Sequence, residues 1–385
     1  MKYILKNKDK NILEFEVEKE DVSCIKNINV ISEKLLPLSI NTKHIEYLLE
    51  KWINKRKIPQ NREFVENILD SIPRDSSDFM AYIDVCFGLS LNDSFWIVPS
   101  DKEYKWKDYN LYENKFNETL ELIALGLKTE KIDGFISSPE FTTNGMLKKC
   151  WHRENNNIYL YKGQMKEYAN MGKEAYCEYY MAQVAEIMGF DYVSYDLKLF
   201  YNEIICACPI FTSEKEGYVP IYVFLKELPK HYNKLKLVRE IIKIYDEESF
   251  ENLMLFDALI CNKDRHLGNF GMIVDNDTNE ILRPAPIFDN GFGILNFIIK
   301  DELKNINLIA SESLSYFDFT FDEQLKLFSK KRHKTNLERL SEFSFQKHPE
   351  FNLSDEWLES IESCIRNRAK MALNFIEGAK INEYV

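Results

Sequence analysis

Apolar and polar residues alternate over residues 2–18, where YILK and ILEFEV flank the polar stretch NKDKN. Alternation with a period of two is typical of a strand with one buried face, and a polar stretch between two such runs favours a hairpin. We therefore expect two antiparallel strands here. Residues 43–55 and 62–72 instead have apolar residues three and four positions apart, which predicts two helices.

The aromatic-rich segment 90–116 fits neither period. We expect it to be irregular but packed, with Trp96 and Trp106 in the core rather than acting as platforms for a ligand. Turn-forming residues gather at 137–140 in the sequence SSPE, and they indicate a boundary between an amino-terminal region and the rest of the chain.

A strand and then a helix are predicted beyond that boundary. The stretch NNNIYLYKG reads as a polar turn followed by an alternating strand, with Lys162 at its end. Residues 173–189 form a helical pattern that stops at Gly189, a residue typical of helix ends. The apolar positions of this helix are Cys177, Met181, Val184 and Met188. Glu178 lies beside them, between small residues, so its carboxylate can point inward.

Further elements follow the same reasoning. Residues 249–262 have apolar residues in helical register and lead into a polar loop. Downstream, GMIV and EILRP flank DNDTN, which predicts a hairpin that brings Asp289 back beside Asn269. Residues 203–211 form a strand pattern, and residues 355–378 form a helix that begins with acidic residues and stops at a glycine.

The composition of the 385-residue chain is that of a globular protein, with 45% hydrophobic and 14% aromatic residues. A formal net charge of -12 argues against general nucleic-acid binding and against binding to anionic membranes. Lys and Asp interrupt the few apolar residues of the first fifteen, so we expect neither a signal peptide nor a membrane span, and we expect a cytoplasmic protein.

Eight cysteines are scattered along the chain, with no CxxC pair. In such a chain they are expected to be reduced and mostly buried. Cys206 and Cys208 alternate as residues on one face of a strand, and no second pair of Cys or His residues completes a zinc site.

The polar loop DRHLGN contains the residues that phosphoryl transfer needs. Asp264 begins it, and a carboxylate at this point can accept a proton from an attacking hydroxyl or orient it. The amide oxygen of Asn269 is a neutral hard ligand that suits a magnesium ion carrying phosphate oxygens, and Asp289 would supply a second oxygen. His266 is expected to brace the loop by hydrogen bonds, because magnesium prefers oxygen ligands.

A phosphate-contacting lysine is also required. Lys162 on a strand followed by Glu178 on a helix is the order by which kinases hold that lysine. The upstream loop FTTNG has donors and a flexible backbone that could cover phosphates: Thr142, Thr143, Asn144 and Gly145. It is neither a GxGxxG nor a Walker A sequence, and taken alone it reads as a hairpin turn.

The loop from Asp264 to Asn269, followed by Asp289, resembles the catalytic and metal-binding loops of HipA-like serine/threonine kinases and of the phosphoinositide kinases that share their fold. In ordinary eukaryotic protein kinases the His-Arg pair precedes the Asp instead. The resemblance covers roughly residues 135–300. It implies an α+β fold with two lobes, of the HipA and phosphoinositide-kinase type, whose carboxy-terminal lobe is mostly helical.

The resemblance also implies a role for each residue. Asp264 would be the catalytic base, and Asn269 and Asp289 would bind magnesium. Lys162 would contact the ATP phosphates and pair with Glu178, while His266 would belong to the nucleotide site. The FTTNG residues Thr142, Thr143, Asn144 and Gly145 would cover the phosphates, and the strand 203–211 would line the adenine pocket.

Three regions follow from this resemblance. Residues 1–135 would pack on the kinase, 136–212 would form its β-rich lobe with the ATP lysine, and 213–385 would form its helical lobe with the catalytic and metal loops. The covering loop differs from the serine-rich loop usual in HipA toxins, so loop autophosphorylation stays open. The first 130 or so residues do not resemble the usual amino-terminal region of these toxins.

Three functions are compatible with these features. The first is an ATP- and magnesium-dependent serine/threonine kinase with a protein substrate and an antitoxin-like regulatory partner. The second is a kinase of a small molecule or lipid headgroup, and the third is a catalytically silent nucleotide-binding module. The basic run KKRHK at 330–334 would be a solvated surface or would attract an acidic or phosphate-bearing substrate.

Overall fold

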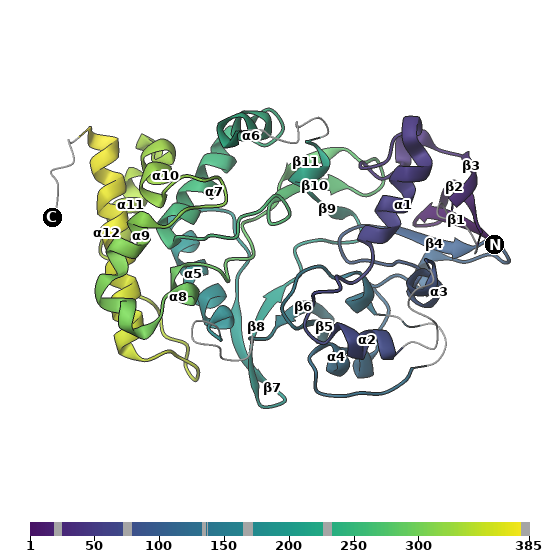
Figure 1. Ribbon diagram of the computed structural model, residues 1–385, viewed down its shortest axis with the longest axis horizontal. Coiled ribbons are helices and arrows are strands. Elements are labelled where there is room, and N and C mark those ends of the chain that lie inside the picture. The colour runs from purple at the N-terminus through teal and green to yellow at the C-terminus, as the bar shows by residue number, and fades with distance from the viewer. Residues whose placement is uncertain are drawn as a thin grey trace. The chain divides into compact units, whose positions relative to one another are not determined.

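The computed structural model describes residues 1–18, 25–71, 79–132, 136, 138–164, 172–225 and 233–378 (Figure 1). The chain forms two compact units. The first consists of Met1–Lys162, Ile210–Val219 and Met272–Arg283. The second consists of Gly163–Pro209, Pro220–Gly271 and Pro284–Val385. This division differs from the three sequence regions expected above, whose functional assignment stays a prediction.

The first unit contains a four-stranded antiparallel sheet in the order β3-β2-β1-β4. Its strands are β1 (Lys2–Asn7), β2 (Lys10–Val17), β3 (Ile25–Val30) and β4 (Phe95–Pro99). The predicted amino-terminal hairpin is confirmed, because β1 pairs with β2 around a turn at Lys8 and Asp9. Leu5, Leu13 and Phe15 lie in the core beside this sheet.

The expectation that residues 90–116 are irregular is wrong at β4, which pairs with β1. Four consecutive residues of β4 are buried, so its sequence lacks the alternation that identifies a half-exposed strand. The expectation for the tryptophans is confirmed. Trp96 and Trp106 are both buried and their rings contact each other edge to face.

The helices of the first unit are short. They are η1 (Glu33–Leu35), η2 (Thr42–His44), α1 (Ile45–Lys55), α2 (Val65–Asp70), α3 (Ala81–Cys86), η3 (Trp106–Asp108), α4 (Glu118–Ala124) and η4 (Pro139–Thr142). Helix α1 confirms the prediction for residues 43–55. Helix α2 is shorter than predicted because Phe64, with a left-handed backbone (φ 59°), precedes its first turn. Ile72, the predicted end of this helix, and Ser137, in the predicted boundary, lie outside the described residues.

Two further groups of strands belong to the first unit. Strands β5 (Lys149–Glu154) and β6 (Asn157–Lys162) form an antiparallel hairpin, as predicted for β6. Strands β9 (Glu216–Pro220), β10 (Gly271–Asp275) and β11 (Ile281–Pro284) form a small sheet in the order β11-β10-β9. The predicted hairpin at DNDTN is therefore confirmed.

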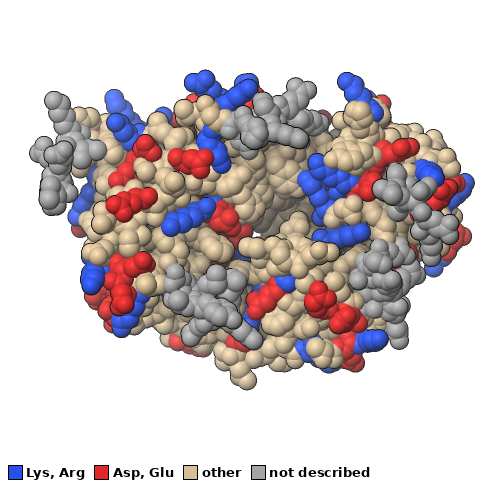
Figure 2. Space-filling view, viewed as in Figure 1, with Lys and Arg blue, Asp and Glu red and all other residues tan. Residues whose placement is uncertain are grey.

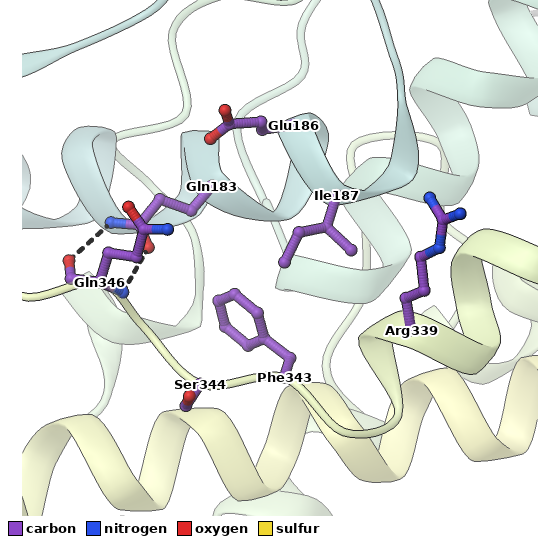
Figure 3. Close-up of a pocket in the computed structure, with 7 residues that line it drawn as sticks. All are labelled: Gln183, Glu186, Ile187, Arg339, Phe343, Ser344 and Gln346. Atoms are coloured by element: carbon purple, nitrogen blue, oxygen red, sulfur yellow. Dashed lines mark hydrogen bonds between the residues drawn. The ribbon is translucent and has the colours of Figure 1, made fainter.

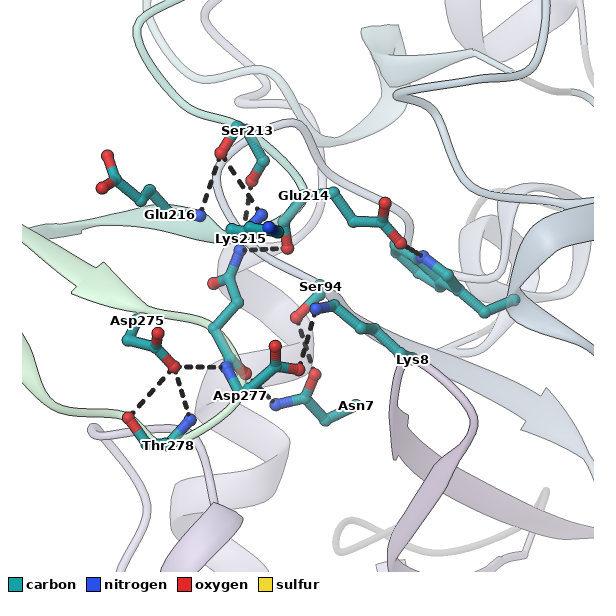
Figure 4. Close-up of polar contacts among 12 residues, drawn as sticks. Asn7, Lys8, Ser94, Ser213, Glu214, Lys215, Glu216, Asp275, Asp277 and Thr278 are labelled. Carbon is teal, nitrogen blue, oxygen red and sulfur yellow. Dashed lines mark hydrogen bonds and ion pairs between the residues drawn. The ribbon is translucent and has the colours of Figure 1, made fainter.

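A polar network joins these late segments to the amino-terminal sheet (Figure 4). Lys8 forms an ion pair of 2.8 Å with Asp277, and Asn7 donates a hydrogen bond of 2.6 Å to the backbone oxygen of Asn276. Ser94 in turn donates to the Asn7 side chain. Because these contacts link residues about 270 positions apart, they explain why the β10–β11 hairpin belongs to the first unit.

The second unit is mostly helical, with one hairpin of strands β7 (Asp196–Phe200) and β8 (Glu203–Pro209). Its helices are α5 (Glu174–Met188), η5 (Ile221–Val223), α6 (Lys234–Ile242), α7 (Glu247–Ile260), α8 (Ile294–Phe297), η6 (Lys300–Asn305), α9 (Ile306–Glu312), α10 (Phe321–Phe328), η7 (Lys331–His333), α11 (Lys334–Leu340) and α12 (Asp355–Glu377). Helix α12 packs against α7, α9, α10 and α11, and these helices run side by side in Figure 1.

The predicted helices α5, α7 and α12 are confirmed. Gly189 follows α5 and Gly378 follows α12, both with a left-handed backbone, and all four apolar positions expected in α5 are buried. The predicted strand at 203–211 is confirmed as β8, in which Cys206 and Cys208 are buried. The seven described cysteines are buried free thiols, and Cys24 lies outside the described residues.

The described helices include none that is both long enough and apolar enough to cross a bilayer. On the face shown in Figure 2, Lys and Arg side chains are interspersed with Asp and Glu. The described part of that face has no extended surface of basic side chains alone.

Candidate active site

The loop that follows α7 contains the predicted catalytic residue. Asp246 caps the start of this helix by accepting a hydrogen bond from the backbone of Ser249, and Cys261 ends it with a left-handed backbone. The buried side chain of Asn262 then accepts a hydrogen bond of 3.1 Å from the backbone N–H of Asp264. These contacts fix the carboxylate of Asp264 at the start of the loop, where it is half-buried.

Arg265, which was not predicted as a site residue, holds this loop in place. Its side chain is fully buried and forms a bidentate ion pair with Asp257 of α7, the shortest N–O distance being 2.9 Å. It also donates hydrogen bonds to the backbone oxygens of Asn269 and Phe288 and to the side chain of Asn290. One guanidinium therefore links the helix, the catalytic loop and the segment around Asp289.

Burial and mutual attraction act in opposite directions on this ion pair, and burial raises the pKa of the Asp257 carboxyl. Burial of the guanidinium opposes its charge, but the contact with Asp257 outweighs burial and raises the pKa of Arg265 above its ordinary value. Because neither charge reaches solvent, each depends on the other for compensation.

Asn269 has the orientation that a metal ligand would need. Its amide nitrogen donates a hydrogen bond of 2.9 Å to the backbone oxygen of Asp264, so its amide oxygen is the atom left to bind a cation. His266 is exposed, and its Nδ1 accepts a hydrogen bond of 3.0 Å from the backbone N–H of Gly268. The prediction that this histidine braces the loop is confirmed.

Asp289 is placed by the backbone around it. It has a left-handed backbone conformation (φ 59°), and its N–H donates a hydrogen bond of 2.9 Å to the hydroxyl of Tyr195. The next residue, Asn290, donates its N–H to the carboxylate of Glu178 at 2.7 Å. The Arg265 side chain donates to the backbone oxygens of both Asn269 and Phe288, and Phe288 directly precedes Asp289. The expectation that the segments of Asn269 and Asp289 lie together is confirmed.

The charges of this site interact. Burial raises the pKa of Asp264, His266 opposes this rise, and the Asp289 carboxylate adds to it. Two carboxylates that repel each other beside a neutral amide oxygen are a hard donor set, as Mg²⁺ prefers. The described residues have no group of three or more His, Cys, Asp or Glu side chains arranged for a metal ion. A magnesium ion that keeps phosphate oxygens and waters as ligands needs only one or two carboxylates from the protein.

Glu178 is buried on α5 and accepts the Asn290 N–H described above. This contact connects the predicted lysine-holding helix to the predicted metal-binding segment within the second unit. Lys162 is buried at the end of β6 in the first unit. The pairing of Lys162 with Glu178 stays a prediction.

A second lysine, Lys149, lies directly opposite Lys162 in the β5–β6 hairpin. Residues opposite each other on antiparallel strands project from the same face, so the two ammonium groups share one face of the hairpin. Lys149 is also buried, and its Nζ donates a hydrogen bond of 3.0 Å to the backbone oxygen of Asn144 in the predicted covering loop. The sequence analysis did not select Lys149.

Within the covering loop, the threonine hydroxyls have partners. Thr142 is buried and donates to the backbone oxygen of Leu89 at 2.7 Å. Thr143 donates to the backbone oxygen of Pro139 at 2.7 Å and accepts a hydrogen bond from the indole N–H of Trp151. Both hydroxyls therefore stabilise the loop itself.

Asn144 and Gly145 form the remaining part of the loop. Gly145 has a positive φ of 100°, a conformation that side chains rarely adopt, and an added Cβ would collide with the ammonium group of Lys149. A glycine at this position thus allows the backbone to pass close to a cation.

Other features carry none of the predicted residues. A pocket of the second unit opens beside α5 and α11 (Figure 3) and is lined by Gln183, Glu186, Ile187, Arg339, Phe343, Ser344 and Gln346. In the basic run 330–334, Lys330 and Arg332 form ion pairs with Glu251, and Lys334 pairs with Glu377. These pairs favour the interpretation of this run as a structural surface.

No protein-family profile matches the sequence, and no curated protein is significantly similar to it. Among solved structures, the chain is similar to HipA of the toxin–antitoxin system of Shewanella oneidensis MR-1, solved with HipB and operator DNA. That similarity has a TM-score of 0.58 at 12% identity and covers 99% of this chain and 100% of HipA. The proinflammatory kinase CtkA of Helicobacter pylori matches with a TM-score of 0.47 at 17% identity, over 63% of this chain and 95% of CtkA.

The similarity to HipA concerns the fold. It confirms the predicted fold class, a mixed α+β kinase-like structure of the HipA type with a helical carboxy-terminal part. The similarity in fold covers 99% of this chain, beyond the residues 135–300 over which the sequence resemblance was seen.

Proposed function

We propose that this protein is an ATP- and magnesium-dependent serine/threonine protein kinase of the HipA-like type. The observation that carries the proposal is the set of Asp264, Asn269 and the segment of Asp289, held together by the buried Arg265 within a HipA-like fold. Phosphoryl transfer requires a carboxylate for the attacking hydroxyl and oxygen ligands for magnesium, and this set contains both.

Each residue has a role in the proposed reaction. Asp264 accepts the proton of the attacking hydroxyl, and burial, which raises the pKa of its carboxyl, makes it a stronger proton acceptor. Asn269 and Asp289 hold the magnesium ion, which neutralises charge on the phosphates when bound. His266 keeps the loop in shape at the edge of the nucleotide site. Glu178 orients the metal segment through Asn290.

On the phosphate side, Lys162 contacts the nucleotide and pairs with Glu178. Lys149, on the same face of the β5–β6 hairpin, adds a second positive charge next to the covering loop. Because the hydroxyls of Thr142 and Thr143 donate to the backbone oxygens of Leu89 and Pro139, the backbone at Asn144 and Gly145 covers the phosphates instead. Strand β8 lines the adenine pocket.

The proposal for a regulatory partner also rests on the similarity to HipA. HipA of Shewanella oneidensis was solved in a complex with HipB and operator DNA, as a toxin–antitoxin system. We propose that this chain also has an antitoxin-like protein partner and a protein substrate in the cytoplasm. Its net charge of -12 makes direct binding to nucleic acid without a partner unfavourable.

The decisive experiment compares the wild type with Asp264→Ala and, as a matched control, Asp301→Ala, which changes an exposed aspartate of the same unit. ATP affinity is measured by titration, and transfer is measured with labelled ATP and a cell lysate. We expect Asp264→Ala to fold and to bind ATP nearly as the wild type does. Its transfer should fall at least about a hundredfold, since positioned base catalysis is commonly worth that much.

The outcomes separate the three functions. Label in protein that disappears with Asp264→Ala supports a protein kinase, and label in lipid or a small molecule points to the alternative kinase chemistry. If neither the wild type nor the Asp301→Ala variant transfers phosphate although both bind ATP, the protein is a nucleotide-binding module. Equal labelling by Asp264→Ala and the wild type would refute the assignment of the base.

A further inference from the structure

The segment 140–149, which contains the predicted covering loop 142–145, is held at both ends by one side chain from the amino-terminal region. Arg62, in the turn before α2, donates to the backbone oxygens of Glu140 at 3.4 Å and Thr143 at 3.3 Å. It also donates to the backbone oxygen of Lys149, at the far end of the loop. A single guanidinium thus connects the two ends of residues 140–149 from a position 78 to 87 residues earlier in the chain.

The charge of Arg62 is matched at the same place. Arg62 is buried and forms an ion pair of 3.2 Å with the carboxylate of Glu140, whose side chain is also fully buried. The other carboxylate oxygen of Glu140 accepts the backbone N–H of Trp151 at 2.7 Å, in strand β5. Glu140 therefore ties the loop to the hairpin that carries Lys149 and Lys162, and Arg62 ties the loop to Glu140.

Lys149 completes this arrangement. Its backbone oxygen accepts from Arg62, while its ammonium group donates to Asn144 in the middle of the loop. A change in the direction of the Arg62 guanidinium would therefore move both the loop backbone and the lysine beside it. Misplacing phosphate-contacting groups by about 1 Å can cost a large part of their effect on a bound nucleotide.

We propose that Arg62 is a positioning residue for the nucleotide phosphates, which acts by setting the conformation of the loop 140–149 and the position of Lys149. This inference rests on the proposed function, and it gives residues 1–135 a role in the nucleotide site. Arg62 does not touch the nucleotide. Its effect is therefore specific to the phosphate part of the ligand, because the loop and Lys149 lie at the predicted phosphates and not at the base.

The chain contains a matched control for this proposal. Arg56, six residues earlier, is buried to a similar degree and donates to the backbone oxygens of Gly88 at 2.5 Å and Phe95 at 3.1 Å. It forms an ion pair with Asp93 and stacks on Trp52, 4.0 Å from its ring centre. Its contacts are thus of the same kind as those of Arg62, but they hold other segments of the same unit.

The experiment measures the affinities of the full chain for ATP with magnesium and for adenosine by titration calorimetry, together with the melting temperature. The variants are Arg62→Gln, Arg62→Lys and the control Arg56→Gln. We expect Arg62→Gln to weaken ATP binding about tenfold and to leave adenosine binding within about twofold. Arg62→Lys should restore part of the ATP affinity, because an ammonium group can reach some but not all of the acceptors that the guanidinium spans.

The control should lower the melting temperature without changing the ratio of the two affinities. The proposal is overturned if Arg62→Gln lowers the melting temperature and leaves that ratio as in the wild type. If Arg62→Gln does not fold, Arg62→Lys decides alone, since a reduced ratio supports the proposal and an unchanged ratio rejects it. If the wild type binds adenosine and ATP equally, the proposed kinase function is rejected together with the role of Arg62. If the wild type prefers ATP and Arg62→Gln keeps that preference, only the role of Arg62 is rejected.

Discussion

Two loops of this protein use the same physical arrangement, and they differ in how far apart its parts lie in the sequence. In the second unit, Arg265 holds the catalytic loop through Asp257, eight residues away, and through backbone oxygens up to 23 residues later. In the first unit, Arg62 holds the covering loop through Glu140, 78 residues away. Each arginine is buried, is paired with one buried carboxylate and donates to at least two backbone carbonyls.

The two ion pairs differ in how far the attraction between their charges offsets the effect of burial on the pKa of each arginine. Asp257 receives several hydrogen bonds from Arg265, and the pKa of Arg265 is raised. In the other pair, burial lowers the pKa of Arg62, although Glu140 opposes this change, and their single side-chain contact is longer at 3.2 Å. Burial raises the pKa of the carboxyl in both pairs, to about 7 for Glu140. Arg265 thus makes more hydrogen bonds to its carboxylate than Arg62 makes to Glu140. Such a difference would suit the proposed site, in which the loop over the phosphates adapts to a ligand while the proposed catalytic residues stay fixed.

The largest expected effect concerns the loop that Arg265 holds. Arg265→Leu leaves the buried Asp257 without a counter-charge and leaves three other acceptors without a donor. Breaking a buried ion pair in this way commonly costs about 3–5 kcal/mol, so we expect severe loss of stability in thermal or urea unfolding.

A double variant serves as the control for that prediction. Arg265→Leu combined with Asp257→Leu should be less destabilised than the sum of the two single changes, because no buried charge is left alone. A single Arg265→Leu variant as stable as the wild type would show that the arginine does not hold the loop.

The next prediction separates the two carboxylates of the catalytic side. Asp289→Asn should lose magnesium-dependent ATP binding more severely than Asp264→Asn, by about tenfold or more in affinity, because Asp289 is the proposed charged metal ligand. The measurement is the magnesium-dependent thermal shift produced by ATP in both variants. Retention of an equal shift in both would remove Asp289 from the proposed metal site.

A smaller effect concerns the predicted covering loop, which contains Gly145. Gly145→Ala forces a side chain into a left-handed conformation and against the ammonium group of Lys149, which should cost about 1–3 kcal/mol of stability and weaken ATP binding. Gly378→Ala, after α12, is the matched control, since it also has a positive φ but has open space around the added Cβ. It should lower stability without affecting ATP. Identical ATP affinity in both variants would argue against a close approach between the loop and the phosphates.

The smallest expected effect concerns a buried polar residue that is neutral. Burial lowers the pKa of His333 to about 4, and its two nitrogens contact the backbone of Lys330 and the side chain of Asn252. A histidine with a lowered pKa contributes stability above about pH 6.5, its ordinary value, and that stability is lost as the pH falls toward 4. The melting temperature should therefore fall between pH 7 and pH 5, and it should fall less in His333→Gln. Parallel curves for the two proteins would contradict the neutral assignment.

The sequence by itself determined the elements and loops that depend on neighbouring residues. Alternation predicted the β1–β2 hairpin, helical spacing predicted α5, α7 and α12, and the turn sequence DNDTN predicted the β10–β11 hairpin. The loop proposed to be catalytic was selected because Asp264, His266 and Asn269 lie within six positions at the end of a predicted helix. A short hairpin then brought the segment of Asp289 back to it. Periodicity and turn preference act over a few residues, so they can be read along the chain.

Only the tertiary structure decided which distant residues complete each site. Strand β4 was missed because burial on both faces removes alternation, and its partner β1 lies about 90 residues earlier. The hydroxyl of Thr142 bonds to the backbone oxygen of Leu89, 53 residues away, and Arg62 holds a loop 78 residues away. The sequence of the loop gives no sign of either contact, since a buried donor or charge is compensated by whichever acceptor the folded chain brings near it. The partner of a buried polar group is thus a property of the packing, whereas the period of a strand or helix is a property of the sequence.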